Sequence, residues 1–275
     1  MLRRRVEPRV KSHEVYTPGY NETAVRYMMR RHAARDAAFV LPHLRKGMSL
    51  LDCSCGPGTI TLGLAEAVSP GHVVGLDLEE SQIDMARNLA VERGLKNVGF
   101  RVGSVYELPF LPHSFDVVFA HALFEHLGDP LAALVEIRRV LKPGGVAAVS
   151  SPDWSGNLMA PRNQEAQEFM EVYKRLQIRN GGNPYVGREL GRLMEEAGFS
   201  AVTVMAMYDC YEDIGLVVEL LAGRLERAVK EGIELETLTL NRTAIEGLCG
   251  AVRRWARGAT LFAQSFVEAV GGAGL

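Results

Sequence analysis

A short glycine turn that follows one acid and precedes another holds the residues best suited to chemistry. The chain reads LDCSCGPG over 51–58, so Asp52 ends an apolar run and Gly56 and Gly58 follow it closely. Glycine lets the backbone approach a ligand where a Cβ atom would clash. A second acid, Asp77, ends the next apolar run, HVVGLD. An acid in that position can accept hydrogen bonds from ribose hydroxyls, so the pattern predicts a nucleoside site.

A dinucleotide site is the main competitor for this turn. Its fingerprint is G-x-G-x-x-G, but the sixth position counted from Gly56 is Thr61. The charge of Asp52 at the mouth of the turn would also oppose a pyrophosphate. A ligand with a cationic centre fits that acid better, and the sulfonium and ammonium groups of S-adenosylmethionine are such centres.

Candidates for acid–base chemistry follow the fourth apolar run, DVVFA. His121 comes directly after this run and is expected to face the site, where it is a weak catalytic candidate. A base at this position is needed only if the substrate carries a proton that must leave. Glu125 and His126 read as structural or supporting residues.

Alternating strands and helices must position these residues. Apolar runs predict strands over 48–52, 72–77, 98–102, 116–120 and 146–150, and helical spacing predicts helices over 59–68, 79–93 and 130–141. This alternation implies right-handed crossovers and a parallel sheet. Ligands bind outside the carboxyl ends of such strands, where the two acids are expected to meet.

The regular alternation breaks after residue 152. The expected organisation is a helical N-terminal segment or lid (1–45), a cofactor-binding core (46–152), a helical lid (153–187), a core helix and strand (188–211), a second helical insertion serving as lid or interface (212–258), and a last strand and tail (259–275). Asp153 and Trp154 leave the fifth strand at its carboxyl end. They either line an acceptor pocket or anchor the insertion to the sheet.

Residues 46–150 resemble the class I S-adenosylmethionine-dependent methyltransferases, in particular the small-molecule subgroup similar to quinone-biosynthesis methyltransferases. The segments that carry the resemblance are LLDCSCGPGT, VVGLDLEESQIDMAR, VGSVYELPF and FDVVFAHALFEHLGDPLAALVEIRRVLKPGG. The resemblance implies an α/β, Rossmann-like, seven-stranded and mostly parallel sheet whose last strand is antiparallel, with helical lid insertions. It also implies S-adenosyl-L-methionine as cofactor and S-adenosyl-L-homocysteine as product.

The resemblance assigns expected roles to individual positions. Two glycines would lie against the methionine part of the cofactor, an acid would bind its ribose, and a tyrosine of the N-terminal segment would fold over it. The expected cofactor-binding residues are Asp52, Ser54, Gly56, Gly58, Asp77, Leu78, Gln82, Ser104, Val105, His121 and Tyr20. Two of them depart from the family pattern, because Ser54 stands where glycine is usual and Ser104 where an aspartate is frequent.

Composition and charge limit the partners. The formal net charge is −2 and no internal stretch is strongly basic, which disfavours nucleic acid. The basic residues of the first eleven positions read as a solvated terminus or a phosphate-binding arm. No stretch approaches the ~20 apolar residues of a membrane span. The four cysteines lack metal-site spacing, so no metal is expected.

These observations favour a cytoplasmic methyltransferase with a small-molecule acceptor, no nucleic-acid or membrane partner, and a monomeric or homodimeric state. Methylation of a protein side chain or a lipid stays open, as does a non-catalytic module that binds S-adenosylmethionine. An NAD-dependent oxidoreductase is disfavoured by Thr61.

Overall fold

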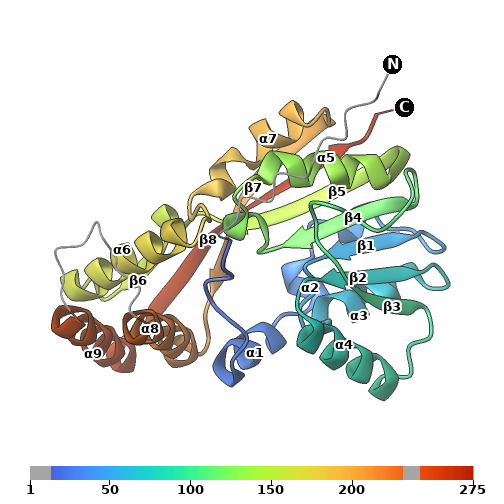
Figure 1. Cartoon of the computed structure of the whole chain (residues 1–275). Coiled ribbons are helices and arrows are strands. Elements are labelled where there is room, and N and C mark those ends of the chain that lie inside the picture. The colour runs from blue at the N-terminus through green and yellow to red at the C-terminus, as the bar shows by residue number, and fades with distance from the viewer. Residues whose placement is uncertain (1–13, 232–241, 275) are drawn as a thin grey trace.

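The computed structural model describes residues 14–231 and 242–274, so the basic N-terminal residues lie outside the described part. Eight strands of that part form one sheet: β1 (Leu50–Cys53), β2 (Val73–Asp77), β3 (Val98–Val102), β4 (Phe115–His121), β5 (Leu141–Pro152), β6 (Leu158–Ala160), β7 (Ser200–Cys210) and β8 (Leu261–Gly272). The sheet order is β3-β2-β1-β4-β5-β8, and β6 and β7 both pair with β8 (Figure 1).

The direction of the strands confirms the expected architecture. Strands β1 to β5 pair in parallel, and β8 runs antiparallel to its neighbours β5, β6 and β7. The sheet has one strand more than the seven expected, because the short β6 pairs with Leu261–Ala263 of β8. Three residues within a segment expected to be helical are too few for an alternating pattern to reveal a strand.

The helices of the described residues are α1 (Glu22–Met29), α2 (Ala33–Asp36), α3 (Thr59–Val68), α4 (Glu80–Glu92), α5 (Pro130–Val140), α6 (Gln164–Arg179), α7 (Leu190–Glu196), α8 (Ile214–Lys230) and α9 (Arg242–Gly258). Four short 3₁₀ turns accompany them: η1 (Leu41–His43), η2 (Phe124–His126), η3 (Trp154–Gly156) and η4 (Val186–Glu189). No described helix has the length and apolar character that a membrane crossing requires.

Local sequence explains where the core helices begin. Asp129 precedes α5, and its side chain accepts a hydrogen bond from the Ala132 amide at 3.1 Å. Pro130 occupies the first turn, where a missing N–H group costs no hydrogen bond. The helix α3 begins directly after Gly58, whose φ of 84° lets the chain turn sharply out of the glycine loop.

Helices cover both faces of the parallel part of the sheet. One face packs against α5 and α7 through apolar side chains that include Leu51, Val118, Leu134, Ile137, Leu190 and Met194. The other face packs against α2 and α3 through Leu50, Val117, Phe119, Ala33, Ile60 and Leu64. Strand β1 is buried along its whole length, so the turn that leaves it has a rigid base.

The helices α6, α8 and α9 form a second apolar core beside the sheet (Figure 1). Its members include Phe169, Tyr173, Leu221, Leu225, Val252 and Trp255, together with Phe262 of β8. The two helical insertions, which are separate in sequence, therefore pack into one helical cap. Strand β8 takes part in both the sheet and the cap.

The N-terminal segment with α1 contacts the cap. The Val15 amide donates to the Asn180 carbonyl at 3.0 Å, at the end of α6. The hydroxyls of Tyr27 and Tyr211 lie 3.0 Å apart, and Arg30 forms a buried ion pair with Asp209 of β7. These contacts place the segment over the carboxyl ends of the core strands.

Candidate functional site

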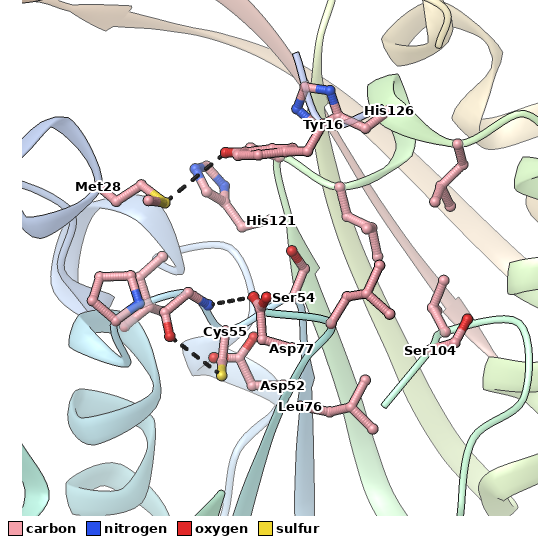
Figure 2. Close-up of a pocket in the computed structure, with 18 of the residues that line it drawn as sticks. Tyr16, Met28, Asp52, Ser54, Cys55, Leu76, Asp77, Ser104, His121 and His126 are labelled. Carbon is pink, nitrogen blue, oxygen red and sulfur yellow. Dashed lines mark hydrogen bonds between the residues drawn. The ribbon is translucent and has the colours of Figure 1, made fainter. Parts of the chain in front are cut away.

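A cavity of about 640 Å³ opens at the carboxyl ends of β1, β2 and β4 (Figure 2). The order of strands reverses here, because β1 lies between β2 and β4, and open α/β sheets bind ligands at such switch points. Nine of the expected cofactor positions line the cavity: Asp52, Ser54, Gly56, Asp77, Leu78, Ser104, Val105, His121 and Tyr20.

Two expected positions do not line this cavity. A Cβ atom at Gly58 would lie 2.8 Å from the Cβ of Ala86, so this glycine permits close contact between the loop and α4. Gln82 is 1% exposed, and neither polar atom of its amide has a hydrogen-bond partner among the described residues. Gly58 therefore lies against α4, and Gln82 is a buried residue of α4 itself.

The glycine loop is held by backbone hydrogen bonds. The amides of Ser54 and Cys55 both donate to the Leu76 carbonyl, at 2.7 and 3.0 Å. Ser54 has a φ of 65° and Gly56 a φ of 52°, so the loop passes through the left-handed region at both positions. Ser54 thus adopts the conformation for which glycine is usual in this motif.

Asp77, the last residue of β2, is hydrogen-bonded to the glycine loop. Its carboxylate accepts hydrogen bonds from the amides of Gly56 at 2.8 Å and Glu79 at 3.0 Å. Burial raises the pKa of Asp77, and these amide bonds oppose that rise. A carboxylate has about four acceptor positions, so acceptor capacity stays available for hydroxyl groups of a ligand in the cavity.

Asp52 lies close to Asp77 at the same end of the cavity (Figure 2). It is 2% exposed and accepts a hydrogen bond from the Thr61 hydroxyl at 2.6 Å. Burial raises the pKa of Asp52 to about 7, although the bond from Thr61 opposes this. A cation in the cavity would favour the charged carboxylate and lower this pKa.

A mostly apolar part of the cavity wall, called the shelf below, is formed by Leu78, Ser104 and Val105, which follow the ends of β2 and β3. Leu78 is 71% exposed, which is unusual for leucine, and Val105 is buried on the cavity wall. The Ser104 hydroxyl oxygen accepts a hydrogen bond from the Tyr106 amide at 3.2 Å. Its O–H group stays available as a donor, so the shelf suits a flat heterocycle with polar edges.

Aromatic residues of the N-terminal segment cover the cavity. The rings of Tyr16 and Tyr20 stack with centroids 5.0 Å apart, and Tyr16 also meets His126 edge-on at 4.7 Å. The Tyr16 hydroxyl donates to the sulfur of Met28 at 3.9 Å (Figure 2). Tyr20 was the tyrosine expected to cover the cofactor, and nothing in the local sequence pattern marks Tyr16 or Met28 as its neighbours.

Arg31 also lines the cavity and was not expected there. Within residues 14–231 and 242–274 its guanidinium has no hydrogen bond or ion pair that the structure shows, and its central carbon lies 5.3 Å from the Tyr27 ring. The sequence around Arg31, RRHAARD, is typical of an exposed polar helix end, so nothing in it marks Arg31 as a cavity residue. The guanidinium of Arg31 therefore lines the cavity with the Tyr27 ring beside it and with no carboxylate paired to it among the described residues.

His121 is the last residue of β4 and is buried between two aromatic rings. Its imidazole stacks with Phe266 at 5.2 Å and with Phe119 at 6.5 Å. Burial, followed by the charge of Arg31, lowers the pKa of His121 well below its usual value. The ring is therefore neutral near pH 7, and its Nδ1 atom has no partner in the described part of the chain.

Other acids of the region have structural partners. Glu125 is buried, accepts a hydrogen bond from the Ser151 hydroxyl at 2.7 Å and lies 3.5 Å from His126 Nε2. Burial raises the pKa of Glu125 to about 7. Asp153 forms an ion pair with Arg188 and does not line this cavity. Among the described residues, no group of His, Cys, Asp and Glu could hold a metal ion.

Comparison with known proteins agrees with this geometry. A family model described as a methyltransferase domain matches residues 44–198. An uncharacterized methyltransferase of Schizosaccharomyces pombe is 37% identical over 174 residues, covering 60% of this chain and 62% of that protein. The match therefore spans less than two thirds of this relative.

A demethylmenaquinone methyltransferase of Listeria monocytogenes is 31% identical over 210 residues, covering 70% of this chain and 88% of that protein. The solved structure of the YcgJ protein of Bacillus subtilis has the same fold, with a TM-score of 0.61 and 19% identity over 88% of this chain and 99% of that one. The cavity at the switch point, the acids at the tips of β1 and β2 and the matching domain show that this chain belongs to the class I S-adenosylmethionine-dependent methyltransferases.

Proposed function

We propose that this protein transfers the methyl group of S-adenosylmethionine to a small-molecule acceptor by in-line displacement. The observation that carries the proposal is the charge pattern of the main cavity, which has two acids at one end and the unpaired Arg31 on its wall. The cofactor carries a ribose, two cationic groups and a carboxylate, and this pattern offers a complementary partner for each.

The residues present fit the cofactor. The free acceptor positions of Asp77 would bind the ribose hydroxyls, and Leu78, Ser104 and Val105 would contact the adenine. Arg31 would pair with the carboxylate of the methionine part. Asp52 would lie near the cationic groups, where its charge becomes favourable once the cavity is filled.

The cofactor, when bound, supplies a methyl group on a positively charged sulfur. The protein must align the acceptor with that methyl group and exclude water. The stacked rings of Tyr16 and Tyr20 line the cavity and would shield the bound cofactor from part of the solvent. His121 stays neutral, so its unpartnered Nδ1 can form a hydrogen bond without adding a positive charge near the sulfur.

A small acceptor is supported by the cover over the site. The N-terminal segment and the helical cap both contact the region above the strand tips, whereas a polymer requires an open groove. The Listeria relative is named for demethylmenaquinone, a small molecule, which favours the same class of acceptor here.

Calorimetric titration with S-adenosylmethionine, S-adenosylhomocysteine and NAD⁺ tests the proposal directly. We expect the first two to bind and NAD⁺ not to bind. The substitution Asp77→Ala should weaken binding by about 1.5–3 kcal/mol, the scale of hydrogen bonds to a charged group.

Asp84→Ala is the matched control, because Asp84 lies on α4 with its side chain 62% exposed and away from the cavity. It should leave the affinity unchanged. Equal affinity of the wild type and Asp77→Ala, or no binding of either adenosyl compound, would contradict the proposed function.

A further inference from the structure

A second, smaller cavity of about 40 Å³ lies beside the main one. Four residues line both cavities: Tyr16, Arg31, Ala122 and His126. The remaining wall comes from α6 and α8 of the cap, from β8 and from Trp154. The two cavities are thus neighbours, and the second lies between the cap and the strand tips.

Aromatic rings dominate the wall of the second cavity. They belong to Tyr16, Tyr27, Trp154, Tyr173, Tyr211, Phe262 and Phe266. Trp154 and Tyr173 pack with ring centroids 5.2 Å apart. Flat rings bind well between such surfaces, because offset and edge-on ring contacts add to the energy of apolar burial.

Gln177 gives this apolar wall a hydrogen-bond acceptor. The side chain is 1% exposed, and its Nε2 group donates to the Glu125 carbonyl at 3.1 Å. This bond fixes the orientation of the side-chain amide, so Oε1 is the amide atom that remains available to accept a hydrogen bond. Oε1 has no hydrogen-bond partner among the described residues. A buried acceptor without a donor costs about 1–3 kcal/mol, and a ligand donor would remove that cost.

Trp154 gives the same wall a donor. Its indole Nε1–H group is buried and has no acceptor within the described part of the chain. Tyr173, which packs on Trp154, lies one helical turn before Gln177 on α6, so the donor and the acceptor belong to the same region of the wall. A hydroxyl group can donate one hydrogen bond and accept another.

We propose that the second cavity holds the methyl acceptor and that the acceptor is a hydroxylated aromatic compound, with Gln177 and Trp154 as its specificity-determining residues. The proposal rests on the proposed methyltransferase function. The ring lies among the aromatic side chains, and its hydroxyl donates to Gln177 Oε1 and accepts from Trp154 Nε1. The cavity is smaller than a ring, so surrounding side chains shift when the acceptor binds.

Two probes test the proposal by calorimetry in the presence of S-adenosylhomocysteine: 4-ethylphenol, and its methyl ether 4-ethylanisole, which is larger by one methyl group and cannot donate a hydrogen bond. We expect the phenol to bind about tenfold more tightly, the factor that 1.4 kcal/mol represents. Gln177→Met should abolish this preference. Trp154→Phe should weaken both probes several-fold, because both carry an acceptor oxygen.

Each substitution has a matched control. Gln167 is exposed on the same helix, so Gln167→Met should change nothing. Trp255 donates instead to the Pro161 carbonyl at 2.8 Å, so Trp255→Phe should leave the preference for the phenol intact. Unchanged affinity for S-adenosylhomocysteine in all variants shows that the main cavity is preserved.

The outcomes separate the two proposals. Failure of the wild type to bind S-adenosylhomocysteine contradicts the proposed function itself. If that ligand binds but neither probe does, or the ether binds as tightly as the phenol, the assignment of the acceptor is wrong. A preference for the phenol that survives Gln177→Met also overturns it.

Discussion

At the scale of single residues, burial controls the charge of the main cavity. Asp52 lies among apolar strand residues, so its carboxyl is neutral more readily than a surface aspartate. His121 is buried as well and stays neutral for the same reason. The side chains of the site therefore carry less charge near pH 7 than its composition suggests, and a cationic ligand would change that.

The first prediction concerns pH. The pKa of Asp52 is raised to about 7 in the free protein, and a bound cation favours the charged form. Affinity for S-adenosylmethionine should hence be greatest above pH 7 and fall below it, by at most about tenfold per pH unit for one proton. The slope of affinity against pH can be measured by calorimetry from about pH 5.5 to about pH 8.5. These limits lie roughly 1.5 units on either side of this pKa.

Two variants identify the titrating group. Asp52→Asn should bind more weakly and without this slope. Glu125→Gln should keep the slope, because Glu125 also has a pKa raised to about 7 but lines only the second cavity. If the pH dependence of the affinity disappears in Glu125→Gln and persists in Asp52→Asn, then Glu125 is the titrating group and the prediction is wrong.

The second prediction concerns Arg31, which contacts the Tyr27 ring and whose Nε atom has no hydrogen-bond partner in the described residues. If it pairs with the cofactor carboxylate, Arg31→Gln should weaken binding of S-adenosylhomocysteine by roughly 2 kcal/mol or more, the lower end for loss of a desolvated charge pair. Arg26→Gln is the control, since Arg26 lies on α1 with its side chain 73% exposed. Equal affinities of the two variants would exclude the carboxylate contact.

At the scale of elements, the N-terminal helix α1 is joined to the end of β7. Arg30 forms a buried ion pair with Asp209 and lies over the rings of Tyr27 and Tyr211, at 4.7 and 4.5 Å. The Tyr211 hydroxyl in turn donates to Gln264 of β8. This network ties the segment that covers the cavity to the strands that enter the cap.

The third prediction follows from this network. Arg30→Met removes the guanidinium and leaves Asp209 buried without its main partner, which costs about 3 kcal/mol. Hydrogen exchange should become faster in residues 14–32 while β1 and β4 stay protected, and affinity for the cofactor should fall. Exchange rates equal to those of Arg26→Gln, whose ion pair with Asp213 is exposed, would contradict this role.

At the scale of the whole molecule, two apolar cores share β8. The cap core contains Leu225 on α8, and the sheet core contains Leu64 on α3, both fully buried. Residues Phe266–Gly272 of β8 pair with β5, and residues Leu261–Ala263 pair with β6 beside the cap. The cap is therefore joined to the sheet by a continuous hydrogen-bonded strand.

The fourth prediction is that cap and sheet unfold together. Leu225→Ala and Leu64→Ala should each cost about 2–5 kcal/mol, the range for a leucine-sized cavity in a core. Each variant should show one calorimetric transition at a lower midpoint. A separate low-temperature transition in Leu225→Ala alone would mean that the cap unfolds independently of the sheet.

Much of the core could be predicted from the sequence, because its signals are local. Strand β3 and helix α3 have the predicted bounds, and the acids at 52 and 77 end adjacent parallel strands, whose tips must meet. Parallel topology thus converts two separate motifs into one site.

The cover of the site could not be predicted in the same way. Arg31 and Tyr16 reach the cavity only because α1 packs against the cap, and no periodic pattern encodes that contact. Gln177 looks like an ordinary polar residue of an amphipathic helix, yet it is buried by tertiary packing. The segment around β6 was expected to be helical, and its pairing with β8 depends on a partner a hundred residues away.

Gln264 and Ser265 lie between the stretch of β8 that pairs with β5 and the stretch that pairs with β6, and both stay paired with β7 through Asp209 and Tyr208. Because β7 pairs with β8 through this point, β8 resists bending where the sheet meets the cap. Phe266 follows immediately, and its ring is stacked on His121. A displacement of the cap would therefore be transmitted along β8 to Phe266 and to the imidazole stacked on it, which lines the main cavity.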